Sequence, residues 1–142
     1  MAQKCIYEIL DEFEVAKNKA DRMKVIGDNL SKTLTEVLLL TYHPKFQWYF
    51  KEMPAGFKFK DVPAGLGYAQ LSTELRKLYL FQKGNPTAEA LTEHKRLQLL
   101  YELLEGLEPR EAEVVIGIFN KDLGVTGLND KFVKEAFPEL LN

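Results

Sequence analysis

The stretch VLLLTYHPKFQWYFKEMP, residues 37–54, joins the most apolar helical pattern of the chain to its densest group of aromatic side chains. Apolar residues cover most of the circumference of its first part, which is typical of a buried helix. Proline lacks an N–H donor and disfavours helix at the residue before it, so Pro44 should end this helix. The helix is expected to start near Ser31 or Thr33, and Thr33 and Glu36 have the spacing of a capping box. We therefore expect a central buried helix, followed by the aromatic segment, residues 42–50.

Two lysines, Lys45 and Lys51, bracket most of these aromatic side chains. Aromatic rings interleaved with lysines can stack on bases and contact phosphates. The alternative is that the rings belong to the hydrophobic core, and the helical spacing of Phe46, Phe50 and Met53 favours it. Under that interpretation Lys45 and Lys51 lie at the rim of the core and are the part of the segment that can reach a nucleic acid.

The rest of the chain carries further helical patterns, each bounded by capping residues, glycine or proline. The pattern predicts an all-α fold, a single domain over residues 1–142 with about seven helices. The segment 53–67 is rich in glycine and proline and is expected to form a loop, with a strand-like run at 56–62. The expected helices lie near residues 6–13, 21–27, 31–43, 68–82, 86–105, 109–119 and 129–137.

Composition narrows the possible functions. The chain has 142 residues, a net charge of −2, one cysteine and two histidines. No signal peptide or membrane span is visible, which predicts a cytoplasmic protein with no membrane partner. The histidines have no metal-ligand spacing, and no phosphate-binding loop or nucleophile motif occurs, so we expect no metal, no cofactor and no enzymatic activity.

The second informative stretch is NKDLGVTGLNDKFVKEAFPELL, residues 120–141. A glycine-bounded turn joins two expected helices, and its backbone amides and the helix start at Asn129 could hold an anion such as a DNA phosphate. An ordinary helical corner explains the same pattern equally well. The polar residues around the turn are Thr126, Asn129, Lys131 and Lys134.

These two stretches carry a resemblance. The runs LLTYHPKFQWYFKEMP and NKDLGVTGLNDKFVKEAFPELL resemble parts of the N-terminal, all-helical DNA-binding domain of ATP-dependent DNA ligases from T-even-type phages. The order and spacing agree over nearly the whole chain. The chain is also similar to small stand-alone proteins of T4-like cyanophages, which share the opening IYEIL and the EAFP-type ending.

The ligase family transfers AMP through a lysine in a Lys-x-Asp-Gly motif on a separate domain, and this chain has no such motif. The resemblance implies a domain that contacts the duplex backbone across the minor groove without the ligase chemistry. By position, the residues that it implies for DNA binding are Lys45, Lys51, Lys121, Thr126, Gly127, Asn129, Lys131 and Lys134.

Two functions follow as hypotheses. The first is a non-catalytic phage accessory protein that binds duplex DNA without strong sequence specificity in the host cytoplasm. The second is a protein–protein interaction module that keeps the ligase-type fold and binds a phage or host protein, which the near-neutral charge favours. A third, weaker reading is that the chain is the excised domain of a longer ligase.

Overall fold

Every regular element in the described part of the chain is helical. The computed structural model describes residues 5–52 and 71–140. The predicted all-α class is therefore confirmed, whereas the expected loop 53–67 with its strand-like run lies outside the described residues. The elements are α1 (Ile6–Val15), α2 (Lys19–Asp28), α3 (Lys32–Tyr42), α4 (Leu71–Glu74), the 3₁₀-helix η1 (Leu75–Phe81), α5 (Pro86–Ala90), α6 (Glu93–Gly106), α7 (Pro109–Asn120) and α8 (Asp130–Ala136).

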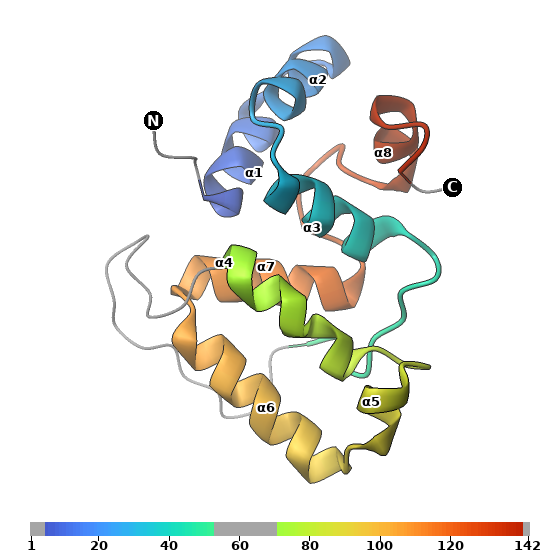
Figure 1. Ribbon diagram of the computed structural model, residues 1–142. Helices are drawn as coiled ribbons and strands as arrows, with labels where there is room; N and C mark the ends of the chain where they lie inside the picture. The colour runs from blue at the N-terminus through green and yellow to red at the C-terminus, as the bar shows by residue number, and fades with distance from the viewer. Residues whose placement is uncertain (1–4, 53–70, 141–142) are drawn as a thin grey trace.

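Helix α3 occupies the middle of the fold (Figure 1). It packs against α7 on one side and α8 on the other, while α1 packs against α2 and α7. Leu34, Val37 and Leu38 are fully buried, as expected for the most apolar helix of the chain. The predicted central buried helix is thus confirmed, and it ends at Tyr42, just before Pro44.

The capping residues explain where most helices begin. The side chains of Asn18, Ser31 and Asn129 each accept a hydrogen bond from a backbone N–H of the first turn that follows.

The prediction of a single helix over residues 86–105 is wrong, because the structure has two helices there. The chain is extended at Leu91, and the Thr92 hydroxyl accepts from the backbone N–H of Lys95, so that α6 begins as a new helix after α5.

The element η1 also differs from the expected α-helix over residues 68–82. A 3₁₀-helix repeats every three residues, so residues three apart lie in one row. Leu75, Leu78 and Phe81 have this spacing and all three are buried. An α-helix would have directed Gln82 toward the core in line with Leu71, Leu75 and Leu78. The 3₁₀ period instead buries the phenylalanine, which removes more apolar surface from water.

Candidate nucleic-acid interface

After α3 ends at Tyr42, the aromatic segment turns at Pro44 and Lys45 and is then extended, not helical, at residues 47–49. Tyr49 N donates to Phe81 O at 2.9 Å, and Lys83 N donates to Gln47 O at 2.8 Å, so residues 47–49 run antiparallel to residues 81–83. Side chains alternate along an extended chain. Trp48 accordingly points inward and is 4% exposed, while Gln47 and Lys51 are exposed on the other side. The expectation of helical spacing is therefore wrong, because this pairing satisfies the backbone after Pro44.

The inward-facing rings form an aromatic layer that closes the core. The Trp48 ring stacks on Phe46 with centroids 6.0 Å apart and contacts the Phe119 ring at 5.3 Å. The Phe50 ring meets Phe81 at 5.9 Å. Trp48 is buried, and Phe46 and Phe50 are half-buried against the core. The interpretation of these rings as core residues is confirmed.

Three exposed lysines lie on or beside this pairing: Lys83 opposite Gln47, Lys45 two residues before Gln47, and Lys51 two residues after Tyr49. We call these three lysines the basic edge. The Lys45 ammonium lies 4.9 Å from the Phe46 ring centroid, and the Lys83 ammonium lies 6.0 Å from that of Tyr49. Lys83 is not among the residues predicted from the sequence. The sequence shows this lysine, but only the antiparallel pairing shows that it lies beside the segment that bears Lys45 and Lys51.

Tyr49 is held in place between these lysines. The buried Arg96 guanidinium lies 3.7 Å from its ring centroid and donates to Ala88 O at 2.8 Å. The Tyr49 hydroxyl donates a hydrogen bond to Glu89, which raises the pKa of Tyr49 and lowers the pKa of the Glu89 carboxyl. Glu89 also accepts from Gly84 N at 2.7 Å. The Glu89 carboxylate beside Tyr49 is therefore already hydrogen-bonded within the protein.

Lys121 has an internal role. It adopts a left-handed backbone conformation (φ 59°) at the end of α7. Its ammonium donates to His43 O at 2.9 Å and to Phe46 O at 2.8 Å. Partial burial lowers the pKa of this lysine. These bonds hold the aromatic segment against the end of α7, a role different from the predicted phosphate contact.

The 124–129 turn is also engaged within the protein. Thr126 N donates to Glu14 Oε2 at 2.8 Å, and the Thr126 hydroxyl donates to Glu14 Oε1 at 3.1 Å. A Cβ built on Gly127 would lie 2.6 Å from Arg22 Nη1, so the Arg22 guanidinium covers this glycine. Asn129 uses its side-chain oxygen to cap α8. The position expected for a phosphate beside Thr126 is thus taken by the Glu14 carboxylate.

A hollow of about 580 Å³ lies between the end of α3 and this turn. Lys121 and Asn129 line it together with Gln47, and two carboxylates, Asp122 and Asp130, lie on the same wall. The hollow extends from Pro44 and Gln47, the sequence neighbours of Lys45, to Asn129 and Asp130 at the start of α8. On that helix Lys131 and Lys134 are exposed, and Lys134 forms a long ion pair of 3.8 Å with Asp130.

Within residues 5–52 and 71–140, no group of three or more His, Cys, Asp or Glu side chains is placed to hold a metal ion. Over the same residues, no helix is long and apolar enough to cross a membrane.

The fold and the site define an all-helical domain with a basic edge beside an aromatic layer. Residues 9–125 match the family described as "Family of unknown function (DUF6433)", and the chain belongs to this family. No curated protein matches the chain.

A solved structure titled "Pmar-Lig_PreS3" is similar, with a TM-score of 0.63 and 17% sequence identity. The match covers 94% of this chain and 30% of that one, so this chain spans about a third of its length. At this identity the likeness concerns the fold.

Proposed function

We propose that this protein binds duplex DNA through the basic edge, as a non-enzymatic accessory protein acting in the cytoplasm of a phage-infected host. The observation that carries the proposal is the antiparallel pairing of residues 47–49 with 81–83, which adds Lys83 to the segment that bears Lys45 and Lys51. Lysines contact phosphates as point charges, and such contacts position a protein on DNA without reading its sequence.

Two features support this surface over the 124–129 turn. The ammonium groups of the basic edge are exposed and form no ion pair among the described residues, whereas Lys121, Thr126 and Asn129 are engaged inside the fold. The resemblance to the DNA-binding domain of phage ligases also supports it, and the fold match to the chain titled "Pmar-Lig_PreS3" is in line with that resemblance. Lys131 and Lys134 extend the surface across the hollow.

The test compares two triple variants of equal charge change. Replacing Lys45, Lys51 and Lys83 with alanine should weaken binding to a duplex of random sequence. If each lysine neutralises one phosphate, the slope of log K against log salt falls by about 0.9 per lysine, or about 2.7 in all. The control replaces three exposed lysines of the α1–α3 region, Lys17, Lys24 and Lys32. It should keep the wild-type slope.

Fluorescence anisotropy over a salt series measures both slopes. The proposal fails if the wild-type protein does not bind the duplex at micromolar concentration and low salt. It also fails if the two triple variants lose affinity equally, because binding would then follow net charge and not the basic edge.

A further inference from the structure

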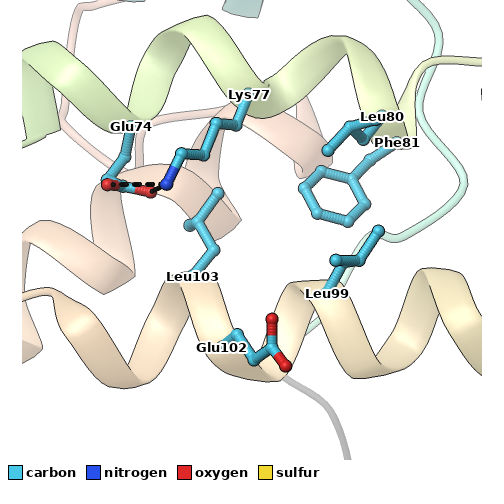
Figure 2. A pocket seen from close by; sticks show the side chains of 7 residues that line it. All are labelled: Glu74, Lys77, Leu80, Phe81, Leu99, Glu102 and Leu103. Atoms are coloured by element: carbon cyan, nitrogen blue, oxygen red, sulfur yellow. Dashed lines mark hydrogen bonds and ion pairs between the residues drawn. The ribbon is translucent and has the colours of Figure 1, made fainter.

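A groove lies between η1 and α6, on residues separate from the three lysines of the basic edge. Figure 2 shows Leu80 and Phe81 from η1 facing Leu99 and Leu103 from α6 across this space. Its volume is about 360 Å³, which is within the range of sites that receive small ligands or anchoring side chains. The lining residues are Glu74, Lys77, Leu80, Phe81, Leu99, Glu102 and Leu103.

The 3₁₀ period of η1 builds one wall of the groove. Glu74, the last residue of α4, precedes Lys77 and Leu80 of η1 at three-residue spacing, so the three lie in one row. Glu74 is buried, and its Oε2 lies 3.1 Å from the Lys77 ammonium in an ion pair, so the two charges on this wall offset each other. The remainder of the wall and floor is apolar. An occupant therefore meets hydrocarbon on the η1 side and no net charge.

The α6 side carries the uncompensated charge. Glu102 is exposed at the rim, and its only described partner is the Gln98 amide at 3.5 Å. Glu105 follows one turn later, close to Glu102 on the helix surface, and is also exposed. Neither carboxylate forms an ion pair within residues 5–52 and 71–140. The groove is apolar inside and acidic along one rim.

We propose that this groove binds a basic amphipathic helix of a partner protein. In this mode of recognition an amphipathic helix places apolar side chains spaced three or four residues apart into a hydrophobic groove. Lysines or arginines beside those anchors would face Glu102 and Glu105, where opposite charges favour the right partner and orientation. This gives the hypothesis of a protein–protein interaction module a specific surface and a specific partner chemistry.

The test uses two synthetic helical peptides of 14 residues, the length of α6. Both carry leucine at positions i, i+3, i+4 and i+7, and the remaining positions are mainly lysine in one peptide and mainly glutamate in the other. The lysine peptide should bind about tenfold or more tightly than the glutamate peptide. Its nuclear magnetic resonance shifts should concentrate on Leu80, Leu99 and Leu103, which is practical for a chain of 16.3 kDa.

Charge reversal separates the groove from the overall acidity of the protein. The double variant Glu102→Lys, Glu105→Lys should reverse the preference and bind the glutamate peptide more tightly. The control reverses two exposed carboxylates elsewhere, Asp21→Lys and Asp28→Lys in α2, and should keep the preference for lysine.

Three results would overturn the proposal. The first is an unchanged preference in the α6 variant, and the second is a set of peptide-induced shifts that lie away from the groove. The third is a concentration-dependent shift of the groove signals without any peptide, which would assign the groove to a second copy of this chain.

Discussion

Lys121 is a charged side chain that stabilises the fold, although the sequence suggests that it contacts a ligand. Its position in a stretch with Thr126, Lys131 and Lys134 suggests a phosphate site. The structure instead directs its ammonium to two backbone carbonyls, at His43 and Phe46. A carbonyl left without its donor in a half-buried place costs free energy. The residue therefore fastens the aromatic segment to the end of α7.

Replacing Lys121 with alanine should lower the free energy of unfolding by about 1–2 kcal/mol, because two hydrogen bonds from a charged donor are lost. Urea unfolding measures the change. The fluorescence of Trp48 reports on the same event locally, since it is the only tryptophan and lies in the aromatic segment. Its emission should shift to longer wavelength as the segment loosens.

The control is Lys131→Ala, which removes an exposed lysine of α8 and should change stability by less than about 0.5 kcal/mol. If both alanine variants unfold at the same urea concentration and emit at the same wavelength, Lys121 does not hold the segment.

At the scale of the elements, capping chemistry predicts helix starts well. The central helix begins after Ser31, close to the predicted position, and α8 begins after Asn129 as expected. The division between α5 and α6 was missed, because no glycine or proline lies between Pro86 and Gly106 to mark the break at Leu91 and Thr92. The period of η1 was missed for a related reason: residues 71–82 contain apolar residues at both three- and four-residue spacing, and only tertiary packing chooses between them.

The 3₁₀ period makes a prediction that an α-helix over the same residues would not make. Phe81→Ala should cost about 3–5 kcal/mol of stability, because it removes a fully buried ring from the aromatic layer. Gln82→Ala should cost less than about 0.5 kcal/mol. Chemical denaturation of both variants provides the comparison. A larger loss for Gln82 would mean that the segment packs with α-helical periodicity in solution.

At the scale of the whole molecule, α1 and α2 form polar contacts with α7, with the 124–129 turn and with α8, which are distant in sequence. Arg110 of α7 donates two hydrogen bonds of 2.7 Å to the Asp11 carboxylate, and Glu14 binds Thr126. Lys19 of α2 forms an ion pair with Glu135 of α8. These contacts join the first helices to the last, so part of their stability depends on ionised carboxylates.

The Arg110 guanidinium lowers the pKa of Asp11 through these hydrogen bonds. The stabilisation is therefore present above the ordinary pKa of an aspartate and is lost as the pH falls through the lowered value. Asp11→Asn should reduce stability at pH 7 by about 0.2–1 kcal/mol, as for other exposed pairs, and this loss should become smaller as the pH falls from 7 to 2. Thermal unfolding across this pH range measures the difference.

The exposed Asp28 gives a control, because Asp28→Asn should show no comparable loss at pH 7. An equal loss for Asp11→Asn at pH 7 and pH 2 would show that the pair acts through packing and not through charge.

The candidate site could be predicted only in part. The sequence shows where lysines and glycines lie, and it identified Lys45 and Lys51, which the structure leaves exposed. It could not show that Glu14 would reach Thr126, or that Lys83 would pair with Gln47, because these partners are distant along the chain. A side chain's availability depends on which partners the fold brings to it.

The 3₁₀ conformation of η1 also determines how long this seven-residue segment is. A 3₁₀-helix rises about 2.0 Å per residue against 1.5 Å for an α-helix, so the seven residues of η1 are about 3.5 Å longer than the same residues wound as α. Its far end delivers Phe81 and Lys83 to the aromatic segment. Rewinding η1 as an α-helix would draw these residues back by that distance and separate Lys83 from Gln47. The rise per residue of one short helix thus determines whether Lys83 reaches Gln47 and joins the basic edge.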